Sequence, residues 1–168
     1  MAVENTKSTA VTSADASTQT LIKPLISNGR VRESVGVIAV ANGDSIASTL
    51  RFCRVHSSWR LRRMEVYCTA ITSAAMDVGV YQVAENGGAV VDADFFASAV
   101  SIATAITVGT NILLESGVLT VADMEKPLWQ ALGLSADPGR WYDIVGTLTA
   151  AATAAGTAVL AVGHVNGD

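Results

Sequence analysis

Two histidines, His56 and His164, are the only imidazoles in the chain, so any Ser-His-Asp arrangement would have to include one of them. His56 lies at a predicted turn among arginines, and His164 lies near the end of the last predicted strand. The sequence lacks the G-x-S-x-G, H-E-x-x-H, Walker and G-x-G-x-x-G motifs. We therefore expect no catalytic residue, and we interpret both histidines as surface or interface residues.

Candidate metal ligands are equally sparse. Asp92 and Asp94 have a spacing found in calcium loops, but no third acid and no glycine-bearing loop accompanies them. The spacing of Cys53, His56 and Cys68 matches no common zinc pattern. A disulfide is not expected either, because the two cysteines lie at different distances from the turn near His56. We expect no metal ion, no cofactor and two free thiols, which suits assembly in a reducing cytoplasm.

Basic side chains are concentrated in residues 51–63, and three interpretations of this cluster remain open. It could bind nucleic acid, although it lacks interleaved exposed aromatics and the whole chain is acidic. It could be an ordinary solvated strand face. It could dock on an acidic protein surface, since forked arginine donors match carboxylates, and this is the interpretation that we favour. The predicted contact residues are Arg51, Arg54, Arg60, Arg62 and Arg63, joined by Lys7 and Lys23.

The charge is unevenly distributed along the chain. Residues 1–63 hold nine basic and four acidic side chains, a net charge of +5, whereas residues 64–168 hold two basic and eleven acidic ones, a net charge of −9. Charged residues make up only 15% of the sequence, below the usual quarter. Both features are typical of a protein that packs against an assembly or against copies of itself.

The elements that would position these residues are predicted to be strands. Val31, Val35, Val37 and Ala39 share one parity, and the turn signal Asn42-Gly43 follows them. Further alternating runs, each taken as one inward face, are Ile46, Leu50 and Phe52; Met64, Val66, Cys68 and Ala70; Met76, Val78 and Val80; Val100, Ile102, Ile106 and Val108; Tyr142, Ile144 and Leu148; and Val159, Ala161 and Val165.

Local irregularities complete this prediction. The phase slips at Arg62 and Arg63, which indicates a β-bulge, because one extra residue reverses the face of a strand. Residues 124–133 are predicted to be helical, with Pro127 early and Gly133 at the end. Residues 92–99 could form a strand or a short helix. The chain is thus predicted to be all-β, a β-sandwich or jelly roll of about eight strands with one or two short helices.

The predicted domain organisation is an extended N-terminal arm over residues 1–29 and a β-sandwich domain over residues 30–168. The arm is rich in Ser, Thr and Ala without apolar periodicity, and we expect it to lie on a partner's surface. It has no basic region followed by an apolar stretch, so no signal peptide is expected. Residues 95–114 and 144–163 are uncharged and long enough to span a bilayer, but they alternate like strands, and a membrane protein is the less favoured interpretation.

Several runs resemble small structural proteins of tailed bacteriophages. They are residues 52–67 (FCRVHSSWRLRRMEVY), 76–81 (MDVGVY), 88–97 (GAVVDADFFA), 127–134 (PLWQALGL) and 141–144 (WYDI). The resemblance covers about residues 30–165 and leaves the arm outside. It implies a jelly-roll-like capsid decoration, or cement, protein, and it brings no catalytic residues.

The resemblance further implies how such a protein works. It would lie on the outer surface of the virion capsid, stabilise it by bridging major capsid protein subunits, and associate with itself as a homodimer or homotrimer. Neither nucleic acid nor membrane is an expected partner. The alternative is a head-fibre or receptor- or glycan-binding module, which would need exposed aromatics; Trp129 and Trp141 lie among core-like residues and are expected to be buried.

Overall fold

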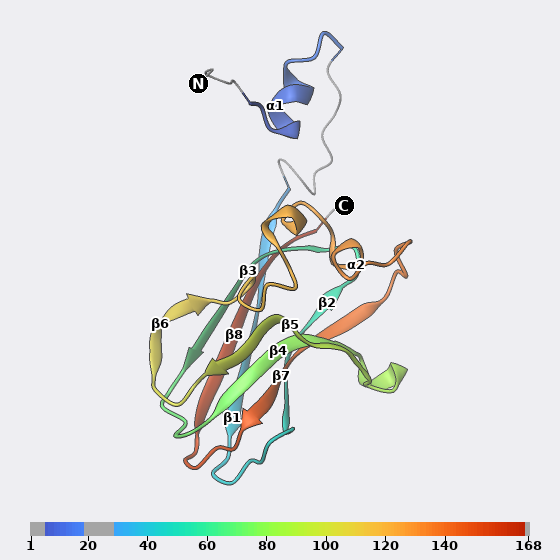
Figure 1. Ribbon diagram of the computed structural model, residues 1–168. Helices are drawn as coiled ribbons and strands as arrows, with labels where there is room; N and C mark the ends of the chain where they lie inside the picture. Colours follow the sequence, from blue (N-terminus) through green and yellow to red (C-terminus); the bar gives the residue numbers. More distant parts are fainter. Residues whose placement is uncertain (1–5, 19–28, 167–168) are drawn as a thin grey trace.

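The computed structural model describes residues 6–18 and 29–166, and within them eight antiparallel strands form two packed sheets (Figure 1). The strands are β1 (Val31–Val40), β2 (Thr49–His56), β3 (Arg60–Cys68), β4 (Ala75–Gln82), β5 (Val90–Ser101), β6 (Ile106–Asn111), β7 (Trp141–Ala150) and β8 (Gly156–Val165). The helices are α1 (Thr9–Ala14) and α2 (Leu128–Ala131), with single 3₁₀ turns η1 (Ala84–Asn86) and η2 (Val121–Asp123). The predicted all-β sandwich with little helix is confirmed.

The order of the strands is that of a jelly roll. One sheet has the order β1-β8-β3-β6, and the other has the order β2-β7-β4-β5. Strand β1 therefore pairs with β8, β2 with β7, β3 with β6 and β4 with β5. This is the pairing of one long hairpin that has been rolled up. Consecutive strands β2 and β3 consequently belong to opposite sheets.

Aliphatic side chains from both sheets fill the space between them. Met64, Met76, Val78 and Leu160 are fully buried, and Phe96 is the largest side chain among the residues with no exposed surface. Most of the runs predicted to face inward do so, including those of β3, β4 and β7. The core is therefore mainly aliphatic, as the low aromatic content indicates.

The predicted orientation of β1 is wrong. Val31, Val35 and Val37 point outward and are 60%, 56% and 66% exposed. The inward positions are held by Gly36, Ile38 and Val40. Gly36 lies so close to β2 that a Cβ there would come within 2.1 Å of the Phe52 carbonyl oxygen. Only glycine permits this approach, and it fixes the parity of the whole strand.

The predicted inward orientation is also wrong for three residues at turns or at a sheet edge, and for the run of alternating residues in β8. Ile46 and Val108 are 63% and 90% exposed, because they lie in the β1–β2 connection and in the edge strand β6. Ala70 follows the end of β3 and is exposed. In β8 the residues of the core between the sheets are Ala158, Leu160 and Val162. The predicted run from Val159 occupies the opposite face, where Ala161 and Val165 are nevertheless buried.

The predicted β-bulge is confirmed. The pairing of β3 with β8 shifts between Leu61 and Arg63, so Arg62 is the extra residue. Residues 92–99 form part of strand β5 and not a helix. The predicted helix at 124–133 is shorter than expected, with α2 limited to Leu128–Ala131 and followed by Gly133 at φ +73°.

The described part of the predicted arm contains α1, whose N-terminus is capped by the Ser8 side chain, and none of the helical residues is buried. The arm at 1–5 and 19–28 lies outside the described residues. The proposed division at residue 29 stays a prediction. Across residues 6–18 and 29–166, no helix combines the length and apolarity needed to cross a membrane.

Candidate partner-binding groove

The predicted basic cluster is divided between the two sheets. Arg51 and Arg54 belong to β2, whereas Arg60, Arg62 and Arg63 belong to β3 of the opposite sheet. The remaining predicted contact residues are Lys7 and Lys23. Lys7 forms an ion pair with Asp15 (2.8 Å) beside α1, and Lys23 lies outside the described residues. The five arginines therefore do not share one face, because β2 and β3 belong to opposite sheets.

The arginines of β2 are held by the protein itself. Arg51 donates from Nη1 to Asp143 Oδ2 (3.0 Å) and to the Gln82 carbonyl (3.1 Å), and from Nη2 to the Gly88 carbonyl (3.0 Å). Arg54 donates from Nε to Asp143 Oδ1 (2.8 Å). Asp143 lies on β7, beside β2, and is buried. Both arginines thus neutralise a buried carboxylate, which leaves Arg51 little capacity for a partner.

The three arginines of β3 have three different environments. Arg63 is half exposed and forms ion pairs with Glu33 (3.4 Å) on β1 and Glu65 (3.5 Å) on its own strand. Arg60 is buried, and its Nη1 donates to the Met124 carbonyl (3.1 Å). Arg62, at the bulge, is exposed and makes no hydrogen bond or ion pair with any described residue.

These arginines line a groove of about 650 Å³ across the outer side of the β1-β8-β3-β6 sheet. One wall comes from β1 and the other from β3 and the connection that follows β6. Gly163 of β8 lies between β1 and β3 and contributes no side chain to the groove. The complete lining is Val31, Glu33, Arg60, Arg62, Arg63, Asn111, Met124, Glu125 and Gly163.

The groove has an excess of positive charge around Arg60 and Arg62. Burial lowers the pKa of Arg60, repulsion by Arg62 lowers it further, and Glu125 partly opposes this. Arg63 is already matched by Glu33 and Glu65. The Arg62 guanidinium therefore lacks a counter-ion among the described residues.

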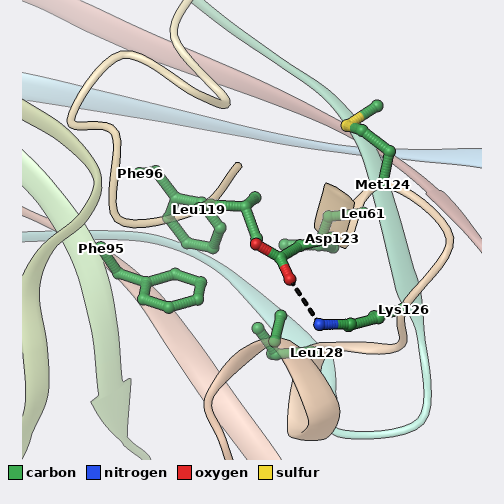
Figure 2. A pocket seen from close by; sticks show the side chains of 9 residues that line it. Leu61, Phe95, Phe96, Leu119, Asp123, Met124, Lys126 and Leu128 are labelled. Carbon is green, nitrogen blue, oxygen red and sulfur yellow. Dashed lines mark hydrogen bonds and ion pairs between the residues drawn. The ribbon is translucent and has the colours of Figure 1, made fainter. Parts of the chain in front are cut away.

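The segment that carries Met124 and Glu125 is fixed by a capping box. Asp123 Oδ2 accepts hydrogen bonds from the Thr120 backbone N–H (3.0 Å) and hydroxyl (2.7 Å), and Lys126 Nζ donates to Asp123 Oδ1 (2.7 Å; Figure 2). The bond from Lys126, with those from Thr120, lowers the pKa of Asp123 to about 2. This box holds the Met124 carbonyl where Arg60 can reach it.

A second hollow lies beneath the same segment and is too small for a ligand. Figure 2 shows Phe95, Phe96, Leu119 and Leu128 around it, next to the Asp123–Lys126 pair. Its volume of about 10 Å³ is no more than a single water requires, whereas ligand pockets have on the order of 300–1,000 Å³. At this size it does not form a binding site.

An aromatic cluster at the ends of β2, β7 and β8 was not foreseen. Trp59 stacks in parallel on His164 with ring centroids 4.1 Å apart, and Trp141 meets the edges of Trp59 (5.3 Å) and His56 (5.0 Å). Trp141 is 45% exposed, so the expectation that it is buried is wrong, and Trp129 is only half buried. His164 is buried, and not at the surface as expected. Sequence spacing could not reveal this cluster, because jelly-roll pairing brings its members together.

Desolvation dominates the environments of the two thiols and of Asp92 on β5. Both cysteines are free, as expected. Burial, and then Asp143, raise the pKa of Cys53 to about 12, and burial also raises the pKa of Cys68. Asp92 and Asp94 lie on β5 and interact with each other, and burial raises the pKa of Asp92. Within the described part of the chain, no three His, Cys, Asp or Glu residues gather as a metal site would require.

Comparison with known proteins adds one structural likeness. No protein-family model and no curated protein matches the sequence. A chain of the structure titled "Cyanophage Pam1 capsid asymmetric unit" is similar in fold, with a TM-score of 0.51 and 17% sequence identity over 82% of this chain and 85% of that chain. At this identity the likeness shows a shared fold, which extends over most of both chains.

Proposed function

We propose that the protein is a non-enzymatic structural component of a tailed-phage virion, which decorates the outer surface of the capsid and stabilises it by bridging major capsid protein subunits. The observation that carries this proposal is the eight-stranded jelly roll, whose fold is shared over most of its length with a chain of a cyanophage capsid asymmetric unit. The resemblance of residues 52–67 and 127–134 to phage cement proteins supports the same role.

Such a protein would act through many modest contacts. Each copy would join two or more capsid subunits, and the symmetry of the shell would repeat that link many times. Because linked contacts reinforce one another, weak individual interfaces suffice to oppose the internal pressure of packaged DNA. Self-association as a dimer or trimer would add further links.

The direct test uses the phage whose genome encodes this chain. Mass spectrometry of purified virions should find the protein in many copies per particle, and purified protein should bind to shells that lack it. Such shells should break at lower temperature than decorated ones. Virions without the protein, or shells that do not bind it, would overturn the proposal.

The N-terminal arm is proposed to contribute to shell binding through Lys7 and Lys23. A chain without residues 1–25 is expected to keep the circular dichroism spectrum of a folded β-sandwich, because no residue of α1 is buried and the core begins at Val40. It should bind shells more weakly than the full chain. Equal binding would exclude a role for the arm.

A glycan-binding head-fibre module is a second candidate, favoured by the exposed ring of Trp141 beside His56. Aromatic rings often serve as platforms for sugars, and Trp141 is accessible to one. A glycan array with a clear hit that is lost in Trp141→Ala would establish this function. An array without hits would leave the capsid role as the better proposal.

A further inference from the structure

We propose that the groove of the β1-β8-β3-β6 sheet binds an extended, carboxylate-bearing segment of a major capsid protein subunit, and that Arg62 is the cation that meets this carboxylate. This inference rests on the proposed function, which supplies the identity of the partner. It deepens that function by naming the site and the chemistry that the partner segment must bring.

Arg62 differs from the other arginines in having no internal counter-ion. Asp143 holds Arg51 and Arg54, and Glu33 and Glu65 hold Arg63. Arg62 has no hydrogen bond or ion pair with a described residue, although it lies only one residue from Arg63. The β-bulge produces this difference, because it places Arg62 outside the register with β8.

The electrostatic environment favours an anion at this point. Arg62 and Arg60 repel each other, and Glu125 is the acid that opposes this repulsion. A carboxylate bound to Arg62 would offset the repulsion between Arg62 and Arg60. The planar guanidinium of Arg62 can donate two parallel hydrogen bonds, one to each carboxylate oxygen. Arg62 thus presents a guanidinium group that can bind a carboxylate, and no described residue of the chain supplies that carboxylate.

The other lining residues distinguish a peptide from a nucleic acid. Glu33 and Glu125 line the groove and would repel a run of phosphates, and the chain has a net charge of −4. Val31 is 60% exposed and Met124 is half buried, so both offer apolar contact. Because Gly163 brings no side chain into the groove, the groove suits an extended backbone that presents one carboxylate and one apolar side chain.

The first experiment measures the affinity for capsid shells of wild type, Arg62→Gln and Arg140→Gln. Arg140 is the matched control, because it is exposed, has no side-chain partner among the described residues and lies outside the groove. Arg62→Gln should bind at least about tenfold more weakly, as expected for loss of a charge-assisted hydrogen bond, and Arg140→Gln should bind within about twofold of wild type. Equal binding by Arg62→Gln overturns the groove proposal alone, whereas absence of binding by wild type overturns the proposed function as well.

A second variant, Gly163→Val, tests the groove by filling it. The atoms nearest to a Cβ at this position belong to Arg63, at 3.6 Å or more, which is ordinary van der Waals contact, so we expect the variant to fold. We expect a thermal midpoint close to that of wild type and at least tenfold weaker binding to shells. Normal binding by a folded Gly163→Val protein would show that the groove is not occupied.

Peptide probes identify the occupant. Overlapping fluorescein-labelled 15-residue peptides of the major capsid protein are titrated with wild type and Arg62→Gln, followed by fluorescence anisotropy. A peptide that binds wild type, loses affinity with Arg62→Gln and loses it again when its Asp or Glu is changed to the amide supports the proposal. The proposal is overturned if the peptide binds equally well after its Asp or Glu is changed to the amide. It is also overturned if no such peptide binds and a 20-nucleotide oligothymidylate binds in a manner that depends on Arg62.

Discussion

At the scale of single residues, Asp143 forms ion pairs with Arg51 and Arg54, and these pairs are expected to stabilise the fold. Its carboxylate is buried and receives Arg51 at 3.0 Å and Arg54 at 2.8 Å. Asp143→Asn should lower the free energy of unfolding by about 2 kcal/mol, because the guanidinium groups lose their counter-ion but stay partly exposed to water. Urea unfolding measures this loss. Glu85→Gln is the control, since Glu85 is 71% exposed and 3.6 Å from Arg54, and a comparable loss there would contradict the assignment.

The thiols of Cys53 and Cys68 are expected to be unreactive in the folded protein. The pKa of Cys53 is raised to about 12, so its thiolate is scarce at pH 8, whereas an unfolded cysteine has a pKa of about 8.5. Iodoacetamide at pH 8 should label the native protein far more slowly than the urea-unfolded protein, with mass spectrometry as the readout. Rapid native labelling at Cys53 would show that this strand opens readily.

His164 is expected to make stability depend on pH. Burial lowers its pKa, and nearby Arg32 lowers it further, so the folded state favours the neutral ring. Its contribution is complete above the unfolded pKa of about 6.5 and decreases as the pH falls below that value towards the folded pKa. Urea unfolding at pH 7.5 and 5.0 should show a larger loss for wild type than for His164→Phe, which keeps a flat ring against Trp59. Equal losses would contradict this role.

At the scale of elements, one glycine sets how β1 packs on β2. Gly36→Ala would place a Cβ 2.1 Å from the Phe52 carbonyl oxygen, and it should destabilise the protein by about 3 kcal/mol because the two strands must separate. Gly163→Ala on β8 is the matched control, with its closest contact at 3.6 Å, and it should change stability by less than about 1 kcal/mol. Thermal or urea unfolding of both variants tests this contrast.

The sequence predicts elements better than it predicts their orientation. The phase slip at Arg62 located the bulge, and alternation located the buried faces of β3, β4 and β7. It misassigned β1, because three outward valines are more hydrophobic than an inward row that begins with Gly36. Hydrophobic content alone cannot show that a backbone–backbone contact excludes side chains from one face.

At the scale of the whole molecule, the fold class was predictable and the candidate site was only partly so. Close strand spacing indicated a sandwich or jelly roll, which the strand order confirms. The basic cluster is apparent in the sequence, but its division between the two sheets depends on which strands pair. The groove also needs Gly163 and Glu125, which lie about a hundred and about sixty residues from Arg62 in the chain.

Self-association is a prediction that belongs to the whole molecule. The proposed function includes a homodimer or homotrimer, and β1 presents Val31, Val35 and Val37 to solvent. Sedimentation equilibrium at micromolar concentration should give two or three times the chain mass of 17.3 kDa. A monomer over the whole concentration range would contradict this part of the proposal.

The place of β8 in its sheet has a consequence for how the protein is made. It is synthesised after both β1 and β3, yet it lies between them and supplies both with hydrogen-bond partners. Until residue 165 has left the ribosome, these two strands have unsatisfied edges, which are exposed to pairing with other chains. Folding must also close a loop from Val31 to Val165, and such distant pairings are formed slowly. A nascent chain of this protein therefore depends on prompt synthesis of β8, and a ribosome that stalls before β8 would release a product prone to aggregation.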